Sequence, residues 1–281
     1  MNRILFALPL LVLASGCGGG SNNSHGTIAL LVTDAPVPFE SVRSATVEID
    51  RITIDGGPYA LAPARVLYQG APIAIEVSNL RNGIARHILS RNVALFEYRR
   101  MHVHFSGAQL ELTNGHQFST ADGSIQLPAG GTNGLEVTIE TPLDVKKGHW
   151  SRLLLDIDMP RSFVPQGTGD LLLAQSLSFE PLMHAVRPGM TGEVRGVVSQ
   201  ANAQGEILPV VDATLYFLPA GTEDLNMAAG STGTEADGSF AKIGLQPGTY
   251  DVVAMKAGVA TTYPACLVGV GGYCVVDLLL P

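Results

Sequence analysis

The stretch "TEADGSFAKIGLQPGTYDVVAMKAG" (residues 234–258) carries the clearest fold information in the chain. Asp237-Gly238 suits a tight hairpin turn, because glycine adopts a positive φ without steric cost. Pro247-Gly248 suits a type II turn, in which proline fixes φ at the second position and glycine supplies the positive φ at the third. The apolar residues around these turns can fill one small core: Phe240, Ile243, Leu245, Tyr250, Val252 and Ala254. The stretch therefore predicts short strands joined by tight turns.

The same β pattern extends over most of the chain. Thirty-two Gly and 17 Pro separate short apolar runs in a sequence that is 46% hydrophobic and only 15% charged, as in proteins with many short strands. Alternation of apolar and polar residues predicts the following strands: 27–36, 44–55, 101–112, 134–141 and 151–160. Within 44–55 the alternation changes phase, which predicts a bulge near Asp50-Arg51.

These strands predict an all-β protein with two β-sandwich domains of Ig-like or transthyretin-like type, because packed sheets are the simplest way to bury them. At most one short helix is expected, at residues 80–89, where Leu80, Ile84 and Ile88 repeat at spacing four. The length of 281 residues is enough for two domains, each with its own core. Pro188-Gly189 breaks the strand pattern, so we place the boundary between domains 26–186 and 187–281 there.

Residues 187–281 resemble the carboxypeptidase regulatory-like domains, which are small transthyretin-like sandwiches. The segments that carry the resemblance are 196–198 (GVV), 209–213 (PVVDA), 234–240 (TEADGSF), 245–250 (LQPGTY) and Gly258. In that family these motif residues form turns and core, so the resemblance implies a fold and no activity. The fold is also grouped with starch-binding-like sandwiches, and glycan binding is therefore a hypothesis by analogy.

Residues 26–186 resemble the domain of unknown function 4382, which occurs in bacterial surface lipoproteins. The resemblance rests on three segments: 26–54 (GTIALLVTDAPVPFESVRSATVEIDRITI), 153–164 (LLLDIDMPRSFV) and 179–186 (FEPLMHAV). It implies a β-sandwich, often followed by a regulatory-like domain, and no established reaction.

The N-terminus predicts an exported, lipid-anchored protein. Residues 4–14 form an apolar run that is too short to span a bilayer but suits a signal peptide, which we assign to residues 1–16. The run ends in Ala14-Ser15-Gly16 before Cys17 and resembles the bacterial lipobox, so Cys17 is the expected lipidation site. Gly18 after the cysteine resembles the pattern of outer-membrane lipoproteins. Residues 17–25 form the expected flexible tether. The alternative is an ordinary secretory signal with an incidental cysteine.

The other two cysteines, Cys266 and Cys274, flank the sequence LVGVGGY. If that stretch is a hairpin that turns near 269–271, the two cysteines face each other across the strands. Export to an oxidising compartment then favours a disulfide, with two buried free thiols as the alternative. The formal net charge of −8 disfavours nucleic acid as a partner, because such binding needs cations that neutralise phosphates.

Two residue sets raise the hypothesis of a metal site. His102 and His104 lie two apart on a predicted strand, so they share a face and could supply two ligands of a zinc-type site. Asp156 and Asp158 also share a strand face, and with Asp34 at another strand end they could hold calcium, which takes six to eight oxygens. Solvent-facing histidines and aspartates that cap turns or pair with Arg161 explain the same residues. Apart from this calcium hypothesis, no cofactor is expected.

Aromatic residues offer a third hypothesis, a sugar-stacking platform, with the alternative that they belong to the core. The residues are Tyr59, Tyr68, Phe96, Tyr98 and Trp150. Catalytic motifs are absent from the sequence: it contains no His-Glu-x-x-His, no Gly-x-Ser-x-Gly and no phosphate-binding Gly-x-x-x-x-Gly-Lys. We therefore expect a non-enzymatic envelope protein with a binding or scaffolding role and a protein or glycan ligand. A carbohydrate-binding module and a metal-dependent hydrolase are the alternatives.

Overall fold

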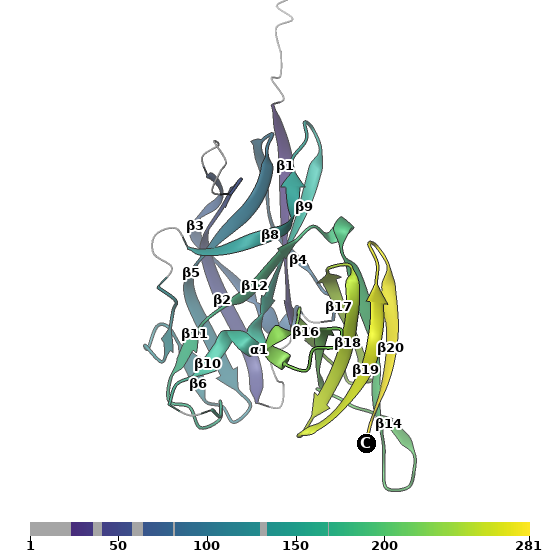
Figure 1. The fold of residues 1–281 in the computed structure, drawn as a ribbon. Coiled ribbons are helices and arrows are strands. Elements are labelled where there is room, and N and C mark those ends of the chain that lie inside the picture. Colours follow the sequence, from purple (N-terminus) through teal and green to yellow (C-terminus); the bar gives the residue numbers. More distant parts are fainter. Residues whose placement is uncertain (1–23, 36–40, 58–63, 81, 130–133, 168) are drawn as a thin grey trace, which may run out of the picture.

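The structure, a computed structural model, describes residues 24–35, 41–57, 64–80, 82–129, 134–167 and 169–281. Strands dominate these residues and form two β-sandwiches that lie side by side (Figure 1), which confirms the predicted all-β class. The helical elements are short: α1 (Met159–Ser162), η1 (Val77–Asn79), η3 (Pro188–Met190) and η4 (Leu225–Met227). No helix in the described ranges is long and apolar enough to cross a membrane.

The first sandwich is built from one nine-stranded sheet, in the order β3-β2-β5-β8-β12-β9-β1-β4 with β6 also paired to β5. Its two halves, β3-β2-β5-β8 and β12-β9-β1-β4, form the two layers and are joined where β8 and β12 run parallel. Strands β7, β10 and β11 form a small separate sheet at one end. The strand bounds are β1 (His25–Ala35), β2 (Val42–Asp55), β3 (Arg65–Glu76), β4 (Arg86–Ala94), β5 (Glu97–Leu112), β6 (Gln117–Ser119), β7 (Ile125–Gln126), β8 (Leu135–Asp144), β9 (Trp150–Asp158), β10 (Phe163–Pro165), β11 (Leu177–Phe179) and β12 (Leu182–Val186).

Apolar and polar side chains alternate along these strands, as the sequence predicts, and the apolar ones fill the space between the two layers of the sandwich. On β5, Met101, Val103 and Phe105 are buried while the histidines between them are partly exposed. The predicted bulge is confirmed, because the register of β2 shifts against both neighbouring strands between Ile49 and Arg51. Each strand therefore presents its apolar side to one core.

The second sandwich has its own core and two four-stranded sheets. In one sheet β13 pairs with β14, β17 and β20, and in the other the order is β16-β15-β18-β19. The strand bounds are β13 (Gly192–Ala201), β14 (Ile207–Pro209), β15 (Thr214–Pro219), β16 (Ser231–Gly233), β17 (Ser239–Leu245), β18 (Gly248–Lys256), β19 (Val259–Val268) and β20 (Tyr273–Leu280).

The helix expected at residues 80–89 is wrong. Leu80 ends the short helix η1, and Asn82 and Gly83 both have positive φ, which an α-helix does not allow. From Arg86 onward the chain is strand β4, antiparallel to β1. The hydrogen bonds offered by the edge of β1 outweigh the apolar repeat at spacing four.

The two predicted turns differ in outcome. Gly238 has φ +77° and its N–H donates to the Glu235 carbonyl at 2.9 Å, while the Asp237 carboxylate accepts the Ser239 N–H. This is a tight turn, but β16 and β17 on either side of it lie in opposite sheets. The type II turn at Pro247-Gly248 is wrong, because Gly248 lacks a positive φ and instead begins β18 opposite Val268.

One residue of the predicted small core faces elsewhere. Ile243 is only partly buried and lies beside Gly83 of the first sandwich, while the inward position next to Phe240 is taken by Lys242. The alternation of buried and less buried residues along β17 shifts by one position before Leu245, next to Gly244, whose φ is +81°.

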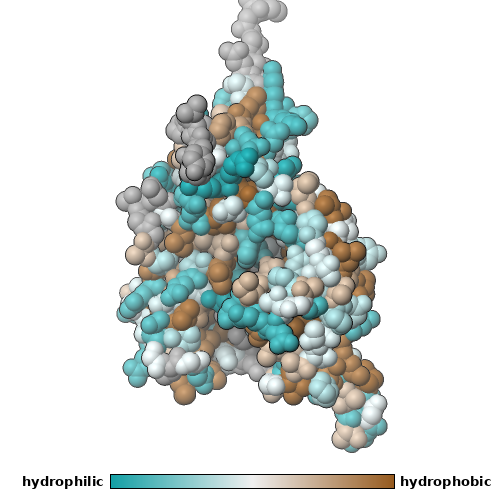
Figure 2. Space-filling model, in the orientation of Figure 1, coloured by the Kyte–Doolittle hydropathy of each residue, from teal (hydrophilic) through white to brown (hydrophobic). Residues whose placement is uncertain are grey.

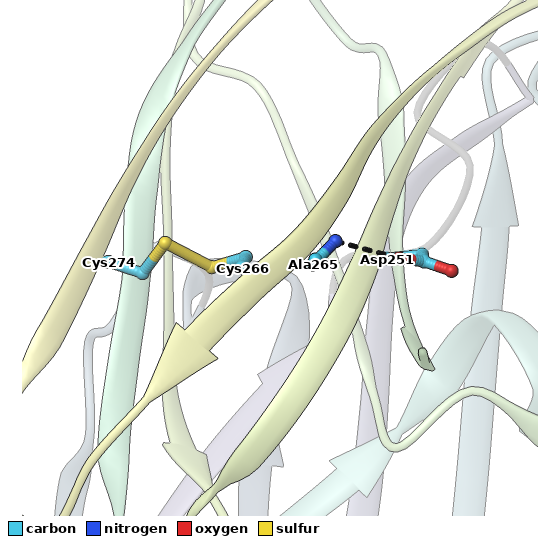
Figure 3. Close-up of a disulfide and its surroundings, with 4 residues drawn as sticks. All are labelled: Asp251, Ala265, Cys266 and Cys274. Atoms are coloured by element: carbon cyan, nitrogen blue, oxygen red, sulfur yellow. Dashed lines mark hydrogen bonds between the residues drawn. A yellow bond between two sulfur atoms is a disulfide. The ribbon is translucent and has the colours of Figure 1, made fainter. Parts of the chain in front are cut away.

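Cys266 and Cys274 form a disulfide, as predicted, but not across one hairpin (Figure 3). Cys266 lies on β19 and Cys274 on β20, and these strands belong to opposite sheets. The bond therefore joins the two sheets of the smaller sandwich at the edge where both strands end a sheet.

Candidate functional site

The outer face of β5 carries the two histidines of the first metal hypothesis. His102 Nε2 lies 2.9 Å from Asp55 Oδ2, and His104 Nδ1 lies 2.6 Å from Asp50 Oδ1. Each imidazole is therefore held by a different carboxylate of β2. The described part of the chain contains no group of three or more His, Cys, Asp or Glu side chains that could hold a metal ion.

Asp55 is the centre of a wider charge network on this face. Its Oδ1 accepts hydrogen bonds from Arg100 Nε at 2.9 Å and from the Gly57 N–H, and Arg100 also reaches Glu136 at 2.8 Å. Burial by itself raises the pKa of Asp55, but the hydrogen bonds from Arg100, Gly57 and His102 together hold the pKa below its ordinary value. The network thus keeps the largely buried Asp55 carboxylate charged on a sheet face that is otherwise partly open to solvent.

Two of the three aspartates of the calcium hypothesis have described side chains, and each of the two is paired with a cationic residue. The side chain of Asp34 lies outside the described residues, although its backbone belongs to β1. Asp156 Oδ2 accepts a hydrogen bond from Lys242 Nζ at 2.5 Å, and Asp158 Oδ2 accepts one from Arg161 Nη2 at 2.6 Å. Both carboxylates are thus engaged by cationic side chains.

These two ion pairs lie where the two sandwiches meet. Lys242 comes from β17 and is only 3% exposed, so the Asp156–Lys242 pair is a buried bridge between the sandwiches. Arg161 donates across the same interface to the carbonyls of Leu225, Asn226 and Ala228, at 3.1 to 3.4 Å.

Asn82 forms a further polar link between the sandwiches. Its Nδ2 donates to Glu235 at 2.6 Å, and its Oδ1 accepts the Ala241 N–H at 3.2 Å. With the Asp156–Lys242 ion pair and the hydrogen bonds of Arg161 to the second sandwich, these bonds connect the sandwiches at three separate points.

A cavity of about 280 Å³ opens beside the Asp156–Lys242 pair. Its floor comes from β8, β9 and β12 of the first sandwich and its other wall from the chain between Gly244 and Tyr250 of the second. The polar residues of the floor are Glu140, Asp156 and His184. We call this cavity the interdomain pocket.

Two buried polar atoms on residues that line the interdomain pocket have no hydrogen-bond partner among the described residues. They are Asp156 Oδ1, an acceptor, and Gln246 Nε2, a donor. Buried polar groups are almost always paired, and leaving one unpaired costs about 1–3 kcal/mol. Two residues that line the pocket therefore carry one unused acceptor and one unused donor, on opposite sandwiches.

The remaining polar groups of the pocket set its charge. His184 Nδ1 lies 3.3 Å from Glu140 Oε1, and Tyr250 donates its hydroxyl to the Gln246 carbonyl at 2.8 Å. Burial, and in addition the negative charge of Glu140, raise the pKa of Tyr250, so this hydroxyl stays protonated as a donor.

Sequence reasoning missed Lys242 and Gln246. A signal for Lys242 was present, because it follows Phe240 at spacing two and so shares the core-facing side of its strand. A lysine at such a position needs a buried acidic partner. No motif in the neighbouring sequence identifies Gln246, because the pocket that it lines has its floor on the other sandwich.

The aromatic residues do not all offer stacking surfaces. Tyr98 is buried and packs edge-on against Phe96, with ring centroids 5.6 Å apart, so it belongs to the core. Tyr59 lies outside the described residues, and the Tyr68 hydroxyl donates to the Ala71 carbonyl. Trp150 is 68% exposed.

The fold and the site together define an all-β protein of two joined sandwiches with a pocket between them. Residues 25–174 match the family model described as "Domain of unknown function (DUF4382)". The match covers more than half of the chain, which therefore belongs to this family. Strands β11 and β12 follow the matched region and complete the same sandwich. No curated protein matches the chain.

Solved structures share only distant similarity with the chain. A candidate carbohydrate-binding protein from Pseudomonas aeruginosa is 15% identical, with 33% of this chain and 90% of that chain covered and a TM-score of 0.25. The shaft pilin SpaA from Lactobacillus rhamnosus GG is 10% identical, with 91% and 97% covered and a TM-score of 0.24. The Bacillus anthracis TIE protein is 8% identical over 92% of this chain and 34% of that one, with a TM-score of 0.23.

Proposed function

We propose that this chain is a lipid-anchored protein of the bacterial envelope that binds a ligand without catalysis. The lipobox-like sequence before Cys17 supports the anchor, and so does the pairing of Cys266 with Cys274, which leaves Cys17 as the one cysteine without a cysteine partner in the chain. The outer membrane is the proposed location, and nucleic acid is not a proposed partner.

The ligand that we propose for the interdomain pocket is a small polyhydroxylated molecule of about monosaccharide size. The observation that carries this proposal is the pair of unpartnered buried atoms, Asp156 Oδ1 and Gln246 Nε2. Hydroxyl groups both donate and accept, so the hydroxyls of a sugar suit an unpaired acceptor and an unpaired donor alike. The volume of about 280 Å³ is near the lower end of small-molecule pockets, which span about 300–1,000 Å³.

We further propose that residues 187–281 form a regulatory-like domain whose role is to complete this pocket. Its support is the turn Gly244–Tyr250, which supplies Gln246 and Tyr250 to a pocket whose floor belongs to the first sandwich. The buried Asp156–Lys242 pair holds this turn in place, so both domains are needed for binding.

The pocket is tested by the thermal unfolding of the purified protein with a panel of monosaccharides and polyols. A ligand at 100 times its Kd stabilises the native state by about 2.7 kcal/mol, which appears as a rise in Tm. Gln246→Leu removes the unpaired donor without touching the ion pair, and we expect it to weaken binding about tenfold, the equivalent of one lost hydrogen bond.

Gln204→Leu is the matched control, because Gln204 is exposed on the turn that joins β13 and β14. This variant should bind like the wild type. A panel in which no compound raises Tm, or a Gln246→Leu variant with unchanged affinity, contradicts the proposed ligand class.

The anchor is tested by fractionation of cells that express the full chain. Cys17→Ser removes the thiol that is acylated, so we expect the protein to lose its acyl chains and its stable association with the outer membrane. Cys274→Ser is a control that removes a different cysteine and should leave acylation intact. Unchanged acylation in Cys17→Ser contradicts the proposed anchor.

A further inference from the structure

Trp150 is the sole tryptophan of the chain and is 68% exposed at the first residue of β9. No function derived above uses it. A large aromatic ring in water is costly, and tryptophan is enriched at membrane–water interfaces, where its ring lies among lipid headgroups.

The residues around Trp150 are cationic in a chain that is otherwise acidic. Residues 146–152 (KKGHWSR) contain two lysines, a histidine and an arginine but no acid, whereas the net charge of the chain is −8. Lys147 and Arg152 are exposed, and Lys146 is exposed beside Asp144, 3.3 Å away. Figure 2 shows hydrophilic side chains gathered at this end of the molecule.

A surface hollow of about 460 Å³ lies beside the ring. Trp150 and Arg152 line it on one side, and Arg187 and the exposed Met190 line it on the other. Arg187 is held in place by a hydrogen bond of 3.0 Å to the Pro142 carbonyl. A hollow lined by an aromatic ring and two arginines suits a phosphate with an apolar chain next to it.

This end of the molecule is also where the described chain begins. Trp150 pairs with Thr27 in the ladder of β1 and β9, and the Gly148 N–H donates to the His25 carbonyl at 3.1 Å (Figure 1). Cys17 precedes His25 by eight residues, and eight residues of any chain span at most about 28 Å. A lipid on Cys17 would therefore keep Trp150 within reach of the bilayer.

We propose that the surface formed by Trp150, Lys147, Arg152 and Arg187 docks on an anionic phospholipid bilayer. This inference rests on the proposed anchor at Cys17. The indole lies among the headgroups, and the three cations contact lipid phosphates. The other end of β9, with Asp158, lies about 26 Å from Trp150 along the strand and away from the membrane, because each strand residue rises about 3.3 Å.

The experiment uses the mature acylated protein in vesicles of phosphatidylethanolamine and phosphatidylglycerol. Trp150 is the sole tryptophan, so its fluorescence reports this one site. Phospholipids brominated on their acyl chains quench nearby indoles, and we expect emission to fall at least about twofold relative to unbrominated vesicles. Lys147→Gln with Arg152→Gln should reduce this quenching, most strongly at low salt.

A matched control moves the reporter to the opposite end. Leu173 is also 68% exposed, and it follows β10, beyond the Asp158 end of β9. Trp150→Phe combined with Leu173→Trp should show little quenching. Intact mass and flotation of the same samples report the anchor. A protein without acyl chains overturns the anchor and this proposal together. An acylated, floating protein whose Trp150 is quenched no more than the Leu173→Trp reporter overturns this proposal alone.

Discussion

The outer faces of β5 and β9 carry similar patterns of alternating charged side chains, yet they lie in different environments. On β5, Arg100, His102 and His104 pair with acidic residues of the neighbouring strands and keep contact with solvent. On β9, Asp156 and Asp158 are covered by the second sandwich and pair with Lys242 and Arg161. The same local pattern therefore gives a solvated polar face in one place and a buried domain interface in the other.

The difference shows which ion pairs contribute most to the stability of this molecule. An exposed pair gains little, because water screens the charges and competes for the hydrogen bonds. A buried pair has already lost its water, so removing one partner leaves an uncompensated charge in an apolar surrounding. Substitutions on the two faces should therefore differ strongly in their cost.

The largest effect is expected for Lys242→Met. It keeps most of the side-chain volume but leaves Asp156 buried without its cation, which costs about 3–5 kcal/mol. That loss corresponds to a fall in Tm of roughly 6–20 °C for a protein of this size, measured by calorimetry. The double variant Asp156→Leu with Lys242→Met should recover much of the loss, because it leaves no charge unpaired.

Lys146→Met is the control for this comparison. Lys146 forms an ion pair with Asp144 in which both side chains are more than half exposed, and we expect a change below about 1 kcal/mol. If Lys242→Met is as stable as Lys146→Met, the Asp156–Lys242 pair does not hold the two sandwiches together.

A smaller effect is expected for Asp55→Asn on the outer face of β5. The carboxylate accepts hydrogen bonds from Arg100, Gly57 and His102, and loss of its charge should cost about 1–2 kcal/mol at neutral pH. The pKa of Asp55 is lower in the folded state than its ordinary value of 3.8, so its stabilising effect is complete above that value. It is lost as the pH falls through the folded pKa.

Denaturant unfolding of the wild type and Asp55→Asn between pH 7 and pH 2 measures this effect. The difference in unfolding free energy should be largest at neutral pH and vanish in acid, since protonation makes the two side chains alike. His104→Gln, at the more exposed Asp50 pair, should change stability least, by less than about 1 kcal/mol. A difference for Asp55→Asn that is constant with pH would show that the carboxylate charge is not responsible.

The strands of the first sandwich could be predicted because their side chains alternate with a period of two. The helix at residues 80–89 could not be excluded in the same way, since Leu80, Ile84 and Ile88 fit a helical repeat whose competitor, the edge of β1, is distant in sequence. The disulfide was predicted from the cysteine spacing and the expected export of the chain, but the two sheets that it joins were not.

The candidate site was less accessible to sequence reasoning than the fold. Asp156 was identified, but as one of several calcium ligands, because its partner Lys242 lies 86 residues away. Gln246 lies beside a turn whose predicted geometry was wrong, and its unpaired amide nitrogen is defined by burial rather than by any motif.

The sequence by itself therefore determined the strands, their apolar sides, the family and the cysteine pair. These follow from local alternation, turn residues and motif spacing, which act over a few residues. The tertiary structure alone decided that the second face of β9 is buried, which carboxylates are paired and where a pocket opens. Those outcomes depend on how two finished sandwiches pack together, and this packing joins residues that have no local relation in the chain.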